Sequence, residues 1–179
     1  MSKQQEVLIN RVANSGLITL NLEDHYPGSE MIIFDIKDYL FHGLILKEKD
    51  FRKALKEHNW DQYSNKIVLI VCSTDAIIPV WAYMLITGYV EGIAADIFAG
   101  DQEEYLKSHY YKVIKGMDLS EYTEKRIVIK GCSNRPVPAA AYLQLTQGLK
   151  PYAQSIMYGE PCSTVPIFKR PGVINKEKS

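Results

Sequence analysis

The chain has 179 residues, of which 46% are hydrophobic and 23% are charged, as in an ordinary globular domain. Lysine plus arginine equals aspartate plus glutamate at 21 each, so the charge gives no reason to expect nucleic acid or an anionic membrane as a partner. No apolar run is long enough to span a bilayer, and the first residues lack the apolar core of a signal peptide. We therefore expect a cytoplasmic protein.

The amino-terminal third contains short β-prone runs separated by turn signals. Residues 17–20 and 31–34 predict two strands, and residues 43–46 are a candidate for a third. A helix is expected next, with Asp50 as its N-cap and with apolar residues at helical spacing up to His58. The pattern indicates a β-rich segment that leads into one helix.

Strands and helices alternate from Lys66 onward. Asp101 and Glu104 form a capping-box pattern at the start of one helix, and Gly88 is the expected stop of another. The predicted strands cover residues 67–71, 94–98, 127–129 and 153–158, and the predicted helices cover 77–87, 101–116 and 138–149. This alternation implies right-handed crossovers between parallel strands.

The sequence therefore predicts an α/β fold, with a mostly parallel sheet, helices on both faces and an N-terminal β-rich segment. Residues 1–168 are expected to form a single domain. Residues 169–179 are polar, contain a Pro-Gly turn signal and lack periodicity, so they are expected to form a flexible tail.

Three cysteines, Cys72, Cys132 and Cys162, lie at or just beyond the carboxyl ends of predicted strands. An odd number of cysteines cannot pair completely within the chain, and in a reducing compartment they are thiols, metal ligands or catalytic groups. The carboxyl ends of parallel strands share one edge of the sheet, where ligands bind. We therefore expect the three thiolates to bind zinc or an iron–sulfur cluster.

Two of the cysteine segments are similar in sequence. Residues 66–86 and 126–145 align with one gap, so that Cys72 matches Cys132 and Pro79 matches Pro138 in the first turn of a helix. We interpret the segments as two copies of one βα unit that place their thiols equivalently. If the strand at 94–98 lies outside, the strands before the three cysteines would be neighbours, about 4.8 Å apart, and their thiolates could share one metal.

A fourth metal ligand is expected from carboxylates near the same edge. Asp75 lies in the loop after Cys72, Glu160 precedes Cys162 by two residues, and Asp35 follows the strand at 31–34. His25 or His42 could also contribute an imidazole, because zinc accepts both kinds of ligand.

Two other functions fit the same residues. A metal-free thiol enzyme or persulfide carrier could use Cys72 or Cys132, because both precede predicted helices and a helix N-terminus activates a thiol. The chain could instead be a non-catalytic homodimeric interaction domain whose cysteines only pack. Motifs for phosphatases, nucleotide-binding proteins and α/β hydrolases are missing from the sequence, so no class of reaction is favoured.

Several motifs resemble an uncharacterised bacterial family, known as domain of unknown function 2480. The segments that carry the resemblance are VANSGLITLNLEDHYP, FDIKDYLFHGLILKEKDFR, CSTDAIIPVWAYM, KGCSNRPVPAAAY and SIMYGEPCSTVPIFKR. They cover nearly the whole chain. The resemblance implies a single cytoplasmic domain without an established activity, and it favours metal or sulfur handling with iron–sulfur assembly proteins as partners.

Overall fold

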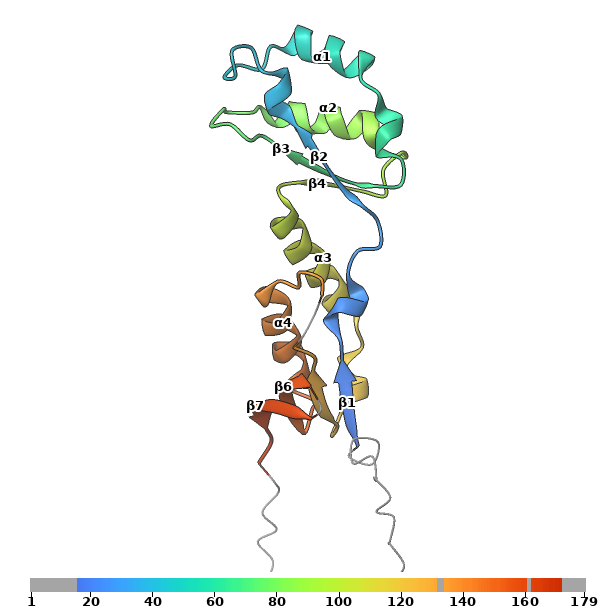
Figure 1. Ribbon diagram of the computed structural model, residues 1–179, viewed down its shortest axis with the longest axis vertical. Coiled ribbons are helices and arrows are strands. Elements are labelled where there is room, and N and C mark those ends of the chain that lie inside the picture. Colours follow the sequence, from blue (N-terminus) through green and yellow to red (C-terminus); the bar gives the residue numbers. More distant parts are fainter. Residues whose placement is uncertain (1–15, 132–133, 161, 172–179) are drawn as a thin grey trace, which may run out of the picture. The chain divides into compact units, whose positions relative to one another are not determined.

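The computed structural model describes residues 16–131, 134–160 and 162–171, and it divides into two compact units (Figure 1). Unit 1 combines the described parts of residues 1–26 and 110–179, and unit 2 consists of residues 27–109. Both units have the predicted α/β fold, in which parallel strands alternate with helices. The single domain over residues 1–168 stays a prediction.

Unit 2 contains a three-stranded parallel sheet in the order β2-β3-β4. Its elements are β2 (Met31–Asp35), the 3-10 helix η2 (Ile36–Tyr39), α1 (Glu48–Glu57), the 3-10 helix η3 (Trp60–Tyr63), β3 (Ile67–Val71), α2 (Val80–Val90) and β4 (Asp96–Ala99). The helix α3 (Gln102–Gly116) begins in this unit. Because β3 is the central strand, its continuous apolar run is buried on both faces.

The core of unit 2 lies on both faces of its sheet. On one face, Phe34 and Val68 pack with Phe51 of α1 and Ile86 of α2. On the other face, Ile67 and Leu69 pack with Tyr105 of α3. Figure 1 shows α1 and α2 on one side of β2, β3 and β4 and the first turns of α3 on the other. The predicted placement of helices on both faces is confirmed in this unit.

Unit 1 contains a mostly parallel four-stranded sheet in the order β1-β5-β6-β7, in which β7 alone is antiparallel. Its elements are β1 (Leu17–Leu20), the 3-10 helix η1 (Leu22–His25), the second part of α3, the 3-10 helix η4 (Leu119–Tyr122), β5 (Arg126–Ile129), α4 (Ala139–Leu149), β6 (Ser155–Glu160) and β7 (Ser163–Lys169). The amino-terminal strands β1 and β2 therefore belong to different sheets.

This division corrects the expected strand order. Cys72 follows β3 and Cys132 follows β5, and these two strands lie in separate sheets rather than side by side. The physical reason is that each central strand takes its own amino-terminal partner, since β2 pairs with β3 and β1 pairs with β5. Sequence patterning specifies that a strand is buried but not which neighbour buries its edge.

Three local predictions are also wrong. Residues 43–46 form no strand, because His42 and Gly43 have positive φ values and make a turn that leaves only the Phe41–Ile45 bridge. The N-cap of α1 is Lys47 rather than Asp50. Gly88 lies inside α2, which continues to Val90.

Other local predictions are confirmed or extended. In the capping box at α3, Glu104 N donates to Asp101 Oδ1 at 2.9 Å and Asp101 N donates to Glu104 Oε2 at 3.1 Å. In the segment expected to be a tail, Lys169 ends β7 and the Arg170 guanidinium donates to the Pro151 carbonyl at 2.6 Å. The rest of that tail, residues 172–179, lies outside the described residues.

The two units repeat one framework, and from α1 onward the repeat has no gap. Val80–Val90 recurs as Ala139–Leu149 and Trp60–Tyr63 as Leu119–Tyr122, a shift of 59 residues (80 to 139 and 60 to 119). The loop hydrogen bond from Asn65 N to Ile93 O recurs from Glu124 N to Tyr152 O at the same shift, and both bonds are 3.0 Å long. Asn65 and Glu124 also share a positive φ, 58° and 59°. The repeat is therefore larger than the βα segment seen in the sequence.

The same shift corrects the pairing of the cysteines. Phe34 pairs with Ile70 in unit 2, and its counterpart Leu20 pairs with Ile129 in unit 1, so Ile129 is the counterpart of Ile70. Counted from there, Cys72 corresponds to Gly131 and Cys132 corresponds to Ser73. The alignment with one gap superimposed the two Cys-Ser pairs. In the structure, the strand register and the starts of the helices instead repeat at a constant shift of 59 residues. At this shift the two cysteines are therefore not counterparts in the sequence.

Candidate functional site

At the carboxyl edge of unit 2, Asp35 ties the Cys72 loop to the neighbouring strand. Its carboxylate accepts hydrogen bonds from Ser73 N at 3.1 Å and from Ser73 Oγ at 2.5 Å. It also caps η2 by accepting from Lys37 N at 3.0 Å, and Lys37 Nζ lies 3.7 Å away. Asp35 ends β2 beside Val71 of β3, so the register of the sheet places it next to this loop.

These hydrogen bonds favour the ionised form of Asp35. Burial raises its pKa, but the bonds from the Ser73 hydroxyl and from the Lys37 and Ser73 N–H groups outweigh burial and hold the pKa below its ordinary value. A carboxylate whose oxygens already accept three hydrogen bonds has little capacity left for a metal. The geometry therefore assigns Asp35 a role in fixing the loop, and its role as a metal ligand stays a prediction.

Cys72 is half-buried and makes polar contacts within its own loop. Its Sγ lies 3.3 Å from Thr74 Oγ1, and the thiol donates to the Thr74 carbonyl at 3.7 Å. Asp75, the next acid along the loop, is exposed. The loop therefore presents one partly accessible thiol near the fixed Ser73.

In unit 1, a tyrosine ring occupies the place that a side chain would need at the counterpart of Cys72. A Cβ on Gly131 would lie 2.7 Å from Cζ of Tyr158, and the Tyr158 hydroxyl donates to the Gly131 carbonyl at 3.2 Å. Tyr142 of α4 meets the same ring edge-on at 5.8 Å between centroids. A side chain at position 131 would therefore force the Tyr158 ring to move, and glycine leaves the ring in place.

The 3-10 helix η1 joins the loop that follows Cys132. Glu23 Oε1 accepts from Asn134 N at 3.0 Å, although the two residues are 111 positions apart. The Arg135 guanidinium lies 5.0 Å from the ring centroid of Tyr26. Cys132 and Ser133 themselves lie outside the described residues. The part of the loop that begins at Asn134 is thus attached to η1 and to its C-cap, Tyr26.

Cys162 is exposed in the turn between β6 and β7, where Glu160 pairs with Ser163. Glu160 is half-buried. His25 lies in η1 of the same unit, whereas His42 lies in the exposed turn of unit 2. The candidate ligands that belong to unit 1 are therefore Cys132, Cys162, Glu160 and His25.

The structure separates the predicted site residues into two groups. Cys72, Asp35 and Asp75 belong to unit 2, whereas the strands before Cys132 and Cys162 are neighbours in unit 1. Within residues 16–131, 134–160 and 162–171, no three His, Cys, Asp or Glu side chains lie close enough together to hold a metal ion. The position of Cys132 falls outside that search.

Sequence reasoning missed Ser73, Tyr158 and Glu23, which shape the two edges. Ser73 has no local signal for its role, because its partner Asp35 is 38 residues distant. Tyr158 and Glu23 had no local signal, since their contacts with Gly131 and Asn134 depend on strand pairing.

Comparison with known proteins places the chain in a family but does not give it a function. None of the helices in the described ranges has the length and apolarity that a membrane crossing needs. No curated protein and no solved structure matches the chain. The family described as protein of unknown function (DUF2480) matches residues 6–170, and the chain belongs to that family.

Proposed function

We propose that the chain is a metal-binding protein that holds zinc or an iron–sulfur cluster with cysteine thiolates at the carboxyl edge of unit 1. Cys132 and Cys162 are the first two ligands of this site. The observation that carries the proposal is that β5 and β6 are adjacent parallel strands, with Ile129 opposite Tyr158. The segments that lead to the two cysteines therefore start side by side.

The length of chain supports this pairing. Cys132 follows Ile129 by three residues and Cys162 follows Tyr158 by four. Consecutive Cα atoms are about 3.8 Å apart and adjacent strands about 4.8 Å apart, so both thiolates can reach one ion with bonds of about 2.3 Å.

Further ligands can come from the same unit. Glu160 is the nearest acid in sequence to Cys162, and Glu23 contacts Asn134 in the loop that follows Cys132. Zinc accepts carboxylate oxygens beside thiolates. Cys72, Asp75 and Asp35 belong to unit 2, so the three-cysteine site stays a prediction that the Cys72 variant tests.

The proposal also includes the cellular compartment, the partners and the oligomeric state of the protein. Cysteine ligands need a compartment that keeps thiols reduced, which the cytoplasm provides. Iron–sulfur assembly proteins are the expected partners if the bound metal is iron. A homodimer would allow two such edges to share one cluster.

The test compares three single variants, C132S, C162S and C72S, purified anaerobically without a tag. Zinc, iron and acid-labile sulfide are measured per chain before and after reconstitution. C132S and C162S are expected to lose most of the metal, because each removes a thiolate ligand. Metal loss in C72S would support the three-cysteine site, and metal retention would support a site confined to unit 1.

Two results would contradict the proposal. One is wild-type protein that contains no metal and takes up none on reconstitution. The other is full occupancy in both C132S and C162S. Unfolding by urea, followed for each variant, separates loss of ligand from loss of fold.

Metal-free thiol chemistry at Cys72 is the second candidate, favoured by the fixed loop around that residue. We propose that Cys72 acts as a nucleophile or carries a persulfide, with Ser73 anchored by Asp35 beside it. Rapid alkylation of Cys72 near neutral pH, slowed in the variant D35N, is the expected result. Alkylation of native Cys72 no faster than that of the unfolded chain would rule this candidate out.

A further inference from the structure

Large aromatic rings fill the space between α1, η3 and α2 in unit 2. Trp60 stacks on Tyr89 with centroids 5.3 Å apart and planes 9° apart. Its other stacking partner is Phe34, at 5.7 Å and 8°. His58 meets the indole at 4.7 Å. The indole N–H donates to the Leu55 carbonyl at 2.8 Å, which fixes the ring within this stack.

The corresponding positions of unit 1 carry smaller, mostly aliphatic side chains. At the ungapped shift of the repeat (60 to 119), Trp60 corresponds to Leu119, Tyr89 to Gly148 and His58 to Met117. The framework around them is the same, because both units share the loop hydrogen bonds and the helix bounds. Unit 1 therefore has the same backbone framework but lacks these three rings.

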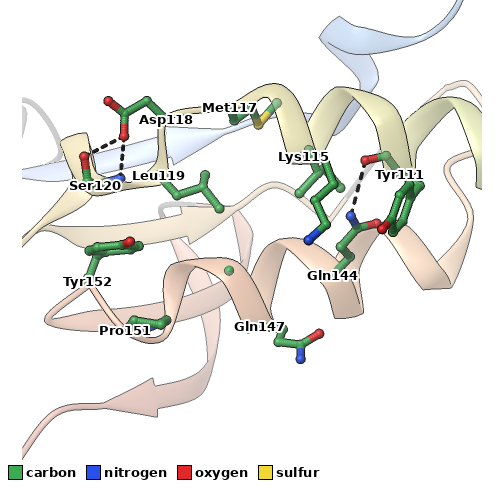
Figure 2. Close-up of a pocket in the computed structure, with 12 residues that line it drawn as sticks. Tyr111, Lys115, Met117, Asp118, Leu119, Ser120, Gln144, Gln147, Pro151 and Tyr152 are labelled. Atoms are coloured by element: carbon green, nitrogen blue, oxygen red, sulfur yellow. Dashed lines mark hydrogen bonds between the residues drawn. The ribbon is translucent and has the colours of Figure 1, made fainter.

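A cavity of about 560 Å³ lies at this place in unit 1, and Leu119, Gly148 and Met117 line it. Figure 2 shows it between the end of α3, η4 and α4. Its volume is within the range of about 300–1,000 Å³ found for small-molecule sites. The cavity is thus located where the other copy holds a stack of aromatic rings.

The walls of the cavity combine aromatic and polar groups. Tyr111 and Tyr152 supply rings, and Gln144 Nε2 donates to the Tyr111 carbonyl at 3.3 Å. Lys115 Nζ lies 5.9 Å from the Tyr111 ring centroid and supplies a positive charge. Asp118 supplies a negative charge, but its Oδ1 accepts from Ser120 N at 3.0 Å and from Ser120 Oγ at 2.5 Å. An anion is therefore attracted on the Lys115 side of the cavity.

We propose that this cavity binds a planar aromatic small molecule, about the size of an indole, that carries one anionic group. The ring takes the place that Trp60 and Tyr89 occupy in unit 2, and the anionic group faces Lys115. Stacking on tyrosine and displacement of water from Leu119 and Met117 favour the ring. This proposal uses none of the cysteines and is independent of the metal site.

The test uses indole-3-acetate as probe and the full chain as protein. Amide shifts in a nuclear magnetic resonance titration are expected at Tyr111, Gln144 and Gln147, with an affinity in about the millimolar range for so small a ligand. Neutral indole is titrated in parallel. The variant K115M should weaken indole-3-acetate about threefold and leave indole unchanged, because an exposed charge contributes little.

A variant whose cavity is filled by aromatic side chains gives the sharper test. G148Y alone would collide with Leu119, whereas Trp60 and Tyr89 coexist in unit 2, so the double variant L119W/G148Y rebuilds the stack. It should bind both probes at least tenfold more weakly while its melting temperature stays equal or rises. The matched control L143W adds an indole at a position on α4 that is 72% exposed and should leave binding unchanged.

Three results would overturn the proposal: no saturable shifts around the cavity in the wild type, undiminished binding by folded L119W/G148Y, or equal loss of binding in L143W. If the double variant does not fold, the K115M comparison decides. Equal effects of K115M on indole and indole-3-acetate would then contradict the placement of the anionic group.

Discussion

The two units place different side chains in one backbone framework. In unit 2, Phe34, Trp60 and Tyr89 stack into an aromatic cluster, whereas their counterparts in unit 1 are Leu20, Leu119 and Gly148. The residues that both units keep are those with backbone or packing duties, such as the prolines and alanines at the starts of α2 and α4 and the positive-φ glycines Gly100 and Gly159. The comparison shows that a few residues maintain the backbone framework, whereas the side chains that pack inside it can differ between the units.

The largest expected effect comes from removing the centre of the aromatic cluster. Phe34 is 2% exposed and stacks on Tyr39 at 5.2 Å as well as on Trp60. F34A should lower the free energy of unfolding by about 3–5 kcal/mol, through lost burial and a cavity. Its counterpart Leu20 is only half-buried, so L20A should cost about half as much. Urea unfolding measures both, and equal losses would contradict the contrast between the units.

A second difference between the units is a buried hydroxyl group, and exchanging Phe and Tyr at two corresponding core positions tests its contribution to stability. Phe51 and Tyr110 are counterparts (51 to 110), and both are buried, but the Tyr110 hydroxyl donates to the Leu22 carbonyl at 3.0 Å. Y110F should cost about 1 kcal/mol by removing that bond. F51Y should cost about 1–3 kcal/mol, because it buries a hydroxyl in an apolar cluster. Unfolding curves in which F51Y is as stable as wild type would show that unit 2 offers a partner there.

Asp35 and Asn21, the N-caps of η2 and η1, differ in charge. The hydrogen bonds that hold the pKa of Asp35 below its ordinary value of 3.8 stabilise the fold above that pH, and this contribution is lost as the pH falls through the folded pKa. D35N should therefore cost about 1–2 kcal/mol at neutral pH, and this cost should shrink as the pH falls below 3.8 through the folded pKa. N21A removes a cap that does not itself titrate, so its cost should change less with pH than that of D35N, and the part that does change reports the bond from Asn21 Nδ2 to Asp24 Oδ1 at 2.7 Å. A constant cost for D35N would refute the assignment.

The smallest expected effect concerns His58, whose counterpart is Met117 (58 to 117). Tyr39 and Tyr63 hydroxyls lie 3.0 Å from its Nδ1 and Nε2, and burial lowers the pKa of its imidazole below 6.5. Because the unfolded chain binds the proton more readily, the fold loses stability as the pH falls from about 6.5 through the folded pKa, by about 1 kcal/mol or less. H58M should flatten this part of the stability curve, and an unchanged slope would exclude His58 as its source.

Local structure could be predicted wherever one segment contains its own signal. The continuous run at Ile67–Val71 gave the central strand β3, and Asp101 with Glu104 gave the start of α3. Single residues gave wrong helix ends. Asp50 predicted an N-cap three residues after the observed one, and Gly88 predicted a helix end inside α2. A helix end depends on what the whole helix packs against, which one residue does not reveal.

The sequence by itself determined the alternation of strands and helices and the presence of a repeated βα segment. Periodicity, capping residues and prolines act within a few positions, so they can be read without a partner. The tertiary structure alone decided that β1 and β2 join different sheets, that Cys72 corresponds to Gly131, and that a cavity replaces the ring stack. Each of these depends on contacts between distant segments, and an apolar strand can meet the same burial requirement beside more than one neighbour.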